Sequence, residues 1–421
     1  TMSWYLSTRT IVLSATIATG LVNAASAAPT NYVLADTIGI PVTPANNQGG
    51  AMNQFDISFV DPLTGIYYFA DRSNASVDII NGATNSVIAQ VGGFAGQQAT
   101  TSVSGPDGVL VVNNGSTATL YAGDGGSILR SFNVSSPSAP VTQGTVNTGG
   151  PPFRVDEMSY SPSLNELFVA NNANSPSFAT LINATPPNPT VALRNIQIPN
   201  QVPSGGMEQS VWDPNTNTFF VSVPTFNGTD AGGVQEFSST GLPIQAFNFS
   251  AQFGIGACSP AGLTLGASGN LMVGCGTAGT QTVVLNPTGT GSIVATLSAV
   301  SGSDELWYDA ANGNDYITGV NATGDRVIDV VSDANYALLQ SIDLTSLGAD
   351  HVNAHSVAVD PLNDEIFVPL EATTPGSPNA LCANGCVAVF SQSVPEPASL
   401  PLLAMALAGI VGVGRMVRRG S

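Results

Sequence analysis

An ionisable side chain recurs at one point of a repeated pattern in this chain, just ahead of a short apolar segment. Only 9% of the residues are charged, so the recurrence is a chemical signal rather than background. Carboxylates offer the oxygen ligands that Ca²⁺ prefers, and an added imidazole would suit a transition metal. Crowded carboxyls also acquire raised pKa values, as general acids and bases do. The residues at or beside this point are Asp56, Asp156, Glu157, Glu208, Asp304, Glu305, His351 and His355.

The rest of the composition excludes several kinds of chemistry. The chain has 421 residues and a formal net charge of -19, and its nine basic residues are all arginines. Without lysine there is neither a Schiff-base nucleophile nor a phosphate-binding P-loop. A Gly-x-Ser-x-Gly nucleophile elbow is absent as well. Nucleic acid is not an expected partner, because binding to phosphates relies on lysine and arginine.

The recurring residue belongs to a unit of strand-like segments and turns. In the first copy, residues 56–71, a short apolar strand is followed by a turn over 62–65 and a second strand. Six steps lead from Pro62 to the matching Pro361, so one unit is about 50 residues long. The other copies are 156–171, 208–223, 304–319 and 355–370, with divergent ones near 106–108 and 266–269.

Each unit continues with a third strand, a turn and a fourth strand, as in 77–80 and 86–89. Four antiparallel strands per unit predict one blade, and seven units predict an all-β fold, a seven-bladed β-propeller over residues 28–392. The last unit ends after its third strand, 387–390, whereas an isolated strand, 32–38, precedes the first unit. We therefore expect the N-terminal strand to complete the last blade and close the ring, which removes an exposed sheet edge.

The repeated body resembles the YVTN-type propeller repeats of bacterial surface proteins, which are relatives in shape of the quinoprotein-like and lactonase propellers. The resemblance spans most of 31–391 and rests on loose patterns such as Ser86-Val-Ile and Asp360-Pro-Leu-Asn-Asp-Glu-Ile-Phe-Val. A β-helix or a pair of β-sandwiches is the alternative. The unit length and the split last blade disfavour both.

In a propeller the recurring position lies at the mouth of the central channel, where residues far apart in sequence converge. Three interpretations stay open there. The polar groups solvate the mouth and accept hydrogen bonds from nearby turns, or they hold a divalent metal such as calcium, or they catalyse a hydrolysis. In the last case Asp156, Glu157 and Glu208 are the candidates for activating water. His351 and His355 have the spacing of a helical zinc pair, but the strand pattern after His355 argues against that geometry.

The four cysteines indicate an oxidising compartment and two local disulfides. Cys258 and Cys275 lie at the two ends of one predicted hairpin, and Cys382 and Cys386 flank a tight loop. Four cysteines allow three pairings, of which the sequential one is the simplest. We therefore predict the pairs Cys258–Cys275 and Cys382–Cys386, with metal binding by the thiols as the alternative.

The N-terminal segment has the pattern of an export signal. Arg9 precedes an apolar stretch from Ile11 to Val22, and Ala25-Ser26-Ala27 matches a cleavage site made of small residues. Residues 1–27 are therefore predicted to be a signal peptide. A buried helix is the alternative.

The C-terminal segment, 393–421, combines three features. The motif Val394-Pro395-Glu396-Pro397-Ala398-Ser399 comes first, an apolar stretch over 400–414 follows, and an arginine-rich end over 415–419 completes it. The stretch predicts a short transmembrane helix with its basic end in the cytoplasm. The segment resembles the PEP-CTERM sorting signal of Gram-negative bacteria, which implies an inner-membrane stage, cleavage by an exosortase, and release or transfer to the outer surface. A plain single-pass anchor is the alternative.

Together these features predict an exported protein of the cell envelope, the outer surface or the extracellular space. The first functional hypothesis is a non-enzymatic scaffold that binds extracellular polysaccharide, surface proteins or a metal ion. The second is a metal-dependent hydrolase of the lactonase kind, with its site at the central channel. Tyr67, Phe226 and Trp307 would stack on sugars if they were exposed, although alternating strand aromatics more often belong to the core.

Overall fold

The computed structural model describes the central part of the chain, residues 31–199, 206–228, 231–276, 281–298, 304–321, 323–347, 354–372 and 382–393. These residues belong to one compact unit, 31–393. The predicted signal peptide, residues 394–421 of the sorting tail with its helix, and His351 lie outside the described residues. Within the ranges given above, no helix has the length and apolar character needed to span a membrane.

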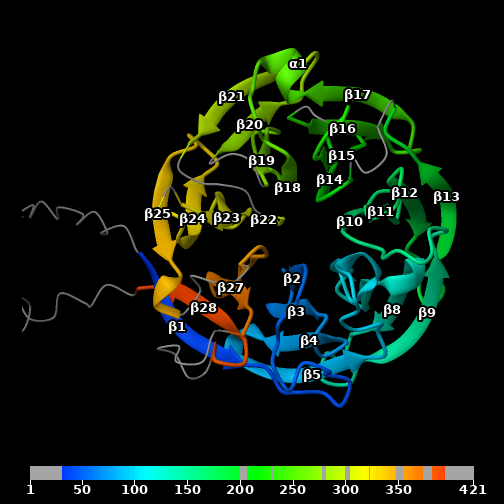
Figure 1. The fold of residues 1–421 in the computed structure, drawn as a ribbon, viewed down its shortest axis with the longest axis vertical. Helices are drawn as coiled ribbons and strands as arrows, with labels where there is room; N and C mark the ends of the chain where they lie inside the picture. Colours follow the sequence, from blue (N-terminus) through cyan, green and yellow to red (C-terminus); the bar gives the residue numbers. More distant parts are fainter. Residues whose placement is uncertain are drawn as a thin grey trace, which may run out of the picture. The chain divides into compact units, whose positions relative to one another are not determined.

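Seven four-stranded antiparallel sheets surround a central axis as the blades of a propeller (Figure 1). The all-β fold and the number of blades predicted from the repeats are therefore confirmed. Blades 1 to 3 consist of β2 (Ser58–Asp61), β3 (Ile66–Asp71), β4 (Ser76–Asn81) and β5 (Ser86–Gly92); β6 (Val109–Asn113), β7 (Ala118–Asp124), β8 (Ile128–Asn133) and β9 (Val141–Asn147); and β10 (Met158–Ser161), β11 (Glu166–Asn171), β12 (Phe178–Asn183) and β13 (Thr190–Ile196).

The remaining blades repeat this order of strands from the axis to the rim (Figure 1). Blades 4 to 6 consist of β14 (Ser210–Asp213), β15 (Thr218–Val223), β16 (Gly233–Ser238) and β17 (Pro243–Asn248); β18 (Pro260–Leu265), β19 (Leu271–Cys275), β20 (Thr282–Asn286) and β21 (Ser292–Leu297); and β22 (Leu306–Asp309), β23 (Asn314–Val320), β24 (Arg326–Ser332) and β25 (Leu338–Asp343). Blade 7 consists of β26 (Ala358–Asp360), β27 (Glu365–Leu370), β28 (Cys386–Gln392) and β1 (Tyr32–Gly39). Short helical segments are Gly82–Thr84, Thr101–Val103, Gly125–Ser127, Phe249–Phe253 (α1) and Thr345–Leu347.

An acidic residue at the end of the innermost strand fixes the first hairpin of several blades. In blade 1, Asp61 Oδ1 accepts a hydrogen bond from the backbone N–H of Leu63 at 3.1 Å. Gly65 then adopts a φ of +67°, a conformation that L side chains rarely take. The same backbone bond is made by Asp213, Asp309 and Asp360. This local turn sets the hairpin register, and with it the place of the polar residue ahead of each inner strand.

The N-terminal strand closes the ring. β1 pairs antiparallel with β28, so the two ends of the described chain share blade 7. Tyr32 strengthens the closure, because its hydroxyl lies 2.7 Å from that of Tyr316 and donates to Asp364 at 2.5 Å. The Gln340 side chain of blade 6 also bonds both backbone polar groups of Tyr32 at 2.8 Å. The predicted addition of strand 32–38 to the last blade is confirmed.

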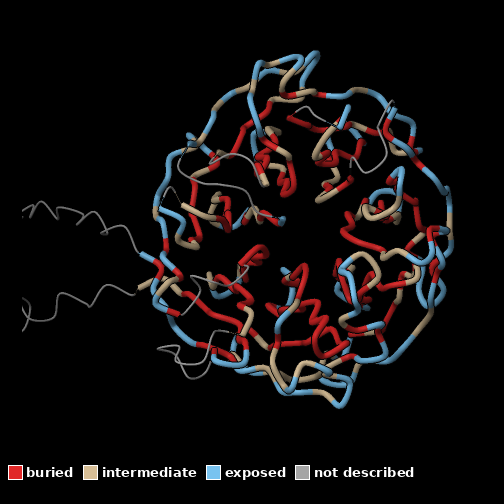
Figure 2. Tube along the Cα trace, in the orientation of Figure 1, coloured by how far each residue is buried: buried red, intermediate tan, exposed pale blue. Residues whose placement is uncertain are grey.

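Apolar side chains fill the space between neighbouring blades. Figure 2 shows buried residues along the inner strands and exposed residues along the rim. Between blades 7 and 1, the rings of Tyr67 and Phe367 stack with their centroids 4.9 Å apart. Tyr67 and Phe226 are only 0% and 6% exposed, so the core interpretation of these two aromatics is confirmed and they do not present a sugar-binding surface. Trp307 is partly buried and lines the central channel.

Both predicted disulfides are present, Cys258–Cys275 and Cys382–Cys386. The first joins the segment ahead of β18 to the end of β19, and the second closes the turn that leads into β28. All four cysteine side chains are buried, and none of these cysteines is free to hold a metal.

Candidate functional site

The recurring polar residues stand just ahead of the inner strands, at one end of the channel. The backbone N–H groups of Asp56, Asp156 and Glu208 each donate to a carbonyl near the end of the second strand of their own blade, at 2.9 to 3.0 Å. This bond gives each residue the same place in its blade. Because the blades repeat around one axis, residues far apart in sequence meet at the mouth.

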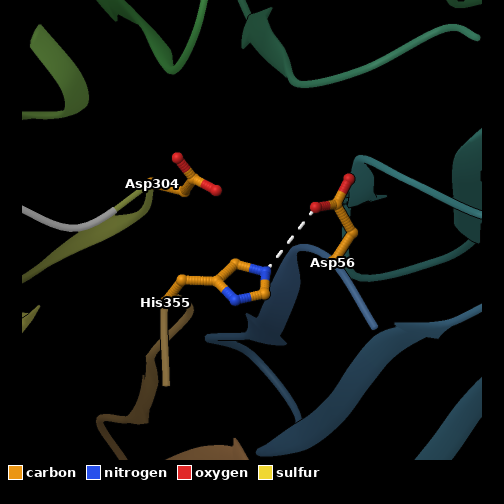
Figure 3. Close-up of side chains that lie close together, drawn as sticks. All are labelled: Asp56, Asp304 and His355. Carbon is orange, nitrogen blue, oxygen red and sulfur yellow. Dashed lines mark ion pairs between the residues drawn. The ribbon is translucent and has the colours of Figure 1, made fainter. Parts of the chain in front are cut away.

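Asp56, Asp304 and His355 come together as a group with the spacing of metal ligands (Figure 3). One donor atom of each lies within 4.8 Å of the others. His355 Nε2 is 3.7 Å from Asp56 Oδ1, and the Phe55 ring stacks on the imidazole with centroids 4.5 Å apart. Asp304 is exposed, whereas Asp56 and His355 are buried. Of the described acidic, histidine and cysteine side chains, these three form the set that could hold a metal ion.

Two buried arginines contact the aspartates of the mouth. The Nη2 atom of Arg72 lies 2.5 Å from both Asp56 Oδ2 and Asp107 Oδ1. Arg154 Nη2 lies 2.7 Å from Asp156 Oδ2, and its Nε atom lies 4.0 Å from Asp107 Oδ1. These five residues form one run of ion pairs across blades 1 to 3, which we call the arginine–aspartate chain. Charged hydrogen bonds of this kind fix the orientation of the groups they join.

The arginine–aspartate chain sets the charge at this side of the mouth. Burial favours the neutral form of Asp56, but Arg72 and His355 outweigh it and hold the pKa of that carboxyl well below its usual range. Burial raises the pKa of Asp156 to about 6, although the charge of Arg154 opposes the shift. Asp56 therefore stays ionised, whereas Asp156 takes up a proton in mildly acidic solution.

Asp107, Arg72 and Arg154 were not among the site residues predicted from the sequence. Of these, only Asp107 had a sequence signal. Asp107 stands two residues ahead of β6, as Asp56 stands two residues ahead of β2, so the divergent copy near 106–108 already marked its place. The two arginines have no counterparts at the equivalent positions of other blades. Repetition therefore does not reveal them.

A second layer of polar side chains lies below the mouth. Its members, such as Glu305, each follow a residue of the mouth by one position in the sequence. The Glu305 carboxylate accepts hydrogen bonds from the Ser356 hydroxyl and from the backbone N–H of Ser58, the latter at 3.2 Å. The hydroxyls of Ser58 and Ser356 are themselves 2.7 Å apart. Burial raises the pKa of Glu305 to about 8, although the hydrogen bond from Ser356 favours ionisation. Glu305 thus links blades 6, 7 and 1 where the ring closes.

Gln209 has the equivalent place in blade 4 and makes a comparable link. Its Oε1 atom accepts from the backbone N–H groups of Leu263 at 2.6 Å and Leu306 at 2.9 Å. Its Nε2 atom donates to the Leu306 carbonyl at 3.0 Å. One side chain therefore joins the inner strands of blades 4, 5 and 6.

Glu157 is the member of this layer without such a partner. Only 4% of the residue is exposed, and among the described residues its carboxyl has no hydrogen-bond or ion-pair partner. Burial raises the pKa of Glu157 well above its usual range, and the charges of Asp156 and Glu208 add to the shift. Burial and the neighbouring carboxyls therefore favour its protonated form.

The channel interior is a cavity of about 420 Å³. Glu157, Gln209 and Glu305 lie in its wall beside apolar and aromatic side chains from blades 1 to 6. The rings of Phe59 and Trp307 meet edge to face there, with centroids 5.4 Å apart. A largely apolar wall with a few polar groups is the usual character of a small-molecule site.

The three candidates for hydrolysis differ in their surroundings. Asp156 is paired with Arg154, and Glu208 accepts a hydrogen bond from Asn172 at 3.2 Å. Glu157 lies one layer deeper and faces the cavity. None of the three belongs to the metal-type group that the described residues contain (Figure 3). The three candidates are therefore neighbours of this group and not members of it.

No family model matches this chain, and no curated protein matches it. Solved structures match it in fold. A chain of a mitotic checkpoint complex has a TM-score of 0.57 and 14% identity, over 92% of this chain and 99% of that one. Raptor of Chaetomium thermophilum has a TM-score of 0.56 and 11% identity, over 87% of this chain and 29% of that one.

The β-propeller domain of Cps50 (Swd1) from Myceliophteria thermophila is similar at a TM-score of 0.58 and 9% identity. The match covers 86% of this chain and 100% of that domain. At such identities the similarity shows the propeller fold alone, because one fold serves many functions.

Proposed function

We propose that this chain is an exported, non-enzymatic binding module of the Gram-negative cell surface. The observation that carries the proposal is the arginine–aspartate chain. It commits three carboxylates of the mouth to buried ion pairs, so these groups hold blades 1 to 3 in a fixed arrangement instead of serving as free bases. A rigid ring that presents loops is suited to binding extracellular polysaccharide or surface proteins.

The proposed export rests on both termini and on the cysteines. Residues 1–27 have the pattern of a signal peptide, and 393–421 resemble a PEP-CTERM tail. Disulfides such as Cys258–Cys275 persist mainly in oxidising compartments. The repeats also resemble the YVTN-type repeats of bacterial surface proteins. We propose that an inner-membrane precursor is cleaved by an exosortase and then reaches the outer surface.

Processing is tested in a Gram-negative host that contains an exosortase. We expect the wild-type chain to lose its C-terminal tail and to appear outside the inner membrane. The double variant Pro395→Ala with Glu396→Ala should stay uncleaved in the membrane fraction, as intact-mass measurement and fractionation would show. Ser393→Ala, next to the motif, is the matched control. Equal release of the double variant would contradict the proposed sorting.

The binding role is separated from hydrolysis with the purified protein. We expect saturable binding to extracellular polysaccharide or to a surface protein from the producing host, and no turnover of an ester and lactone panel. Turnover that requires a divalent ion such as calcium, and that is lost with Asp304→Asn or His355→Gln, would replace this proposal with the hydrolase. Metal analysis of the same preparation shows whether an ion accompanies the Asp56, Asp304 and His355 group.

A further inference from the structure

The cavity in the channel has an acidic and aromatic wall without positive charge. Glu157 and Glu305 contribute carboxyls to it, and Phe59, Trp307 and Tyr308 contribute rings. None of the described residues that line it is an arginine or a histidine. The two arginines of the arginine–aspartate chain are engaged at the mouth instead.

Glu157 is the acidic group of this wall for which the described residues provide no partner. Glu305 is already bonded to serines of two other blades, and Gln209 is bonded to two strands. The Glu157 carboxyl is buried, lines the cavity and has no hydrogen-bond or ion-pair partner among the described residues. Buried polar groups in folded proteins are nearly always paired, with protein, water or a ligand.

The chemistry of the wall favours an organic cation over a metal ion or a neutral molecule. Ca²⁺ is bound by about six to eight oxygen ligands that lie close together. Neither Glu157 nor Glu305 belongs to the metal-type group formed by the described residues. Aromatic faces attract ammonium groups through their quadrupoles, and a carboxylate adds charge complementarity that a neutral ligand would not use.

We propose that the channel binds a small organic monocation, of the quaternary or primary ammonium class, between the Glu157 carboxylate and the aromatic wall. The inference rests on the proposed binding function and deepens it by naming a class of ligand. Because the cavity has a volume of about 420 Å³, it suits a compact ammonium compound rather than a polymer.

Binding should release a proton. Burial raises the pKa of Glu157 well above the usual range, and the acidic side chains of Asp156, Glu208, Glu305 and Asp304 add to the shift. A permanently charged ligand favours the carboxylate, so the Glu157 proton leaves to solvent as the complex forms. Affinity should therefore increase as pH rises toward the raised pKa, and the released proton should be measurable.

The test is calorimetric titration of the purified protein with choline, whose charge does not depend on pH. We expect saturable binding and an enthalpy that varies with the ionisation heat of the buffer, as proton release requires. The neutral isostere in which carbon replaces the quaternary nitrogen should bind at least about tenfold more weakly. Equal binding of the isostere, or no binding of choline, would overturn the proposal.

Variants locate the site. Glu157→Gln keeps the shape of the protonated side chain and should weaken choline binding by about tenfold or more. Glu166→Gln, on β11 of the same blade and outside the cavity wall, is the matched control and should leave binding unchanged. Val211→Phe adds volume to the cavity wall and should block binding without altering a carboxyl. Undiminished binding by a folded Glu157→Gln or Val211→Phe protein would place the ligand elsewhere.

The outcomes distinguish this inference from the proposed function. A negative choline titration combined with polysaccharide or surface-protein binding would remove only the channel ligand. Choline binding by a protein that also hydrolyses lactones would keep the channel site and remove the non-enzymatic role.

Discussion

Blades 1 to 3 and blades 4 and 6 carry acidic residues at the same point of the repeat, but only the first group joins them to arginines. Asp56 and Asp107 share Arg72, and Asp156 is paired with Arg154. By contrast, within the described part of the chain neither Glu208 nor Asp304 forms an ion pair with an arginine. The difference shows that a position in the repeat places a carboxyl at the mouth, whereas side chains outside the repeat decide its charge and role.

Asp56 and Glu305 respond to pH in opposite directions. The pKa of Asp56 is lowered, so its stabilising contribution is present above the ordinary pKa of an aspartate and is lost as pH falls through the folded value. The pKa of Glu305 is raised to about 8, so the folded chain keeps a proton that the unfolded chain has lost. Its effect runs the other way, and stability falls as pH rises from about 4.5 to about 8.

The largest expected loss of stability comes from removing an arginine from blades 1 to 3, where arginines pair with the acidic residues of the mouth. Arg72→Met leaves Asp56 and Asp107 buried without their ion pairs, which should lower the free energy of unfolding by about 3 to 5 kcal/mol. Denaturant titration of the folded protein measures the loss. Arg194→Met, at an exposed position of β13, is the control and should cost less than about 0.5 kcal/mol. Equal losses in both variants would mean that the arginine–aspartate chain has no special structural role.

The next effect concerns the side without arginines. Glu305→Gln cannot titrate, so between about pH 5 and about pH 8 it should lose less stability than the wild type, by about 1 kcal/mol or more. Denaturant titrations at several pH values measure the two slopes. Asp343→Asn, an exposed change, should follow the wild type. If the stability of Glu305→Gln depended on pH in the same way as that of the wild type, the Glu305 carboxyl would not hold its proton in the folded state.

A smaller effect is expected from the serines that bind Glu305. Ser356→Ala removes one hydrogen bond to the carboxyl and should cost about 1 kcal/mol. Ser58→Ala should show coupling to it in a double-mutant cycle, because the two hydroxyls are 2.7 Å apart. Ser136→Ala, at an exposed position, is the control. Strict additivity of the two serine changes would argue against a shared network at the ring closure.

The smallest effect is expected at the exposed carboxyl of the mouth. Asp304→Asn should change the free energy of unfolding by less than about 0.5 kcal/mol, because its side chain is solvated and no ion pair is described for it. Thermal unfolding would measure this difference. A decrease in the free energy of unfolding as large as that of Arg72→Met would show that Asp304 stabilises the fold as much as the ion pairs of Arg72 do.

Most of the fold could be predicted because its signals are local and repeated. The turn after Asp61 has a counterpart after Asp360, and both make the same backbone hydrogen bond. The unpaired strand ahead of the first unit indicated how the ring closes, and the spacing of Cys258 and Cys275 indicated their disulfide. The site was predicted only in part, because Arg72, Arg154 and Gln209 do not recur in the repeat and act on partners in other blades.

By itself, the sequence determined the blades, their order and the place of one ionisable residue ahead of most inner strands, because strand alternation and turn chemistry act over a few neighbouring residues. Only the tertiary structure decided which of these residues are ionised. Glu305 meets Ser58 across 247 positions of the chain, and Arg72 reaches Asp107 in the next blade. A carboxyl's pKa depends on burial and on the charges within a few ångströms, and those neighbours exist only once the ring has closed.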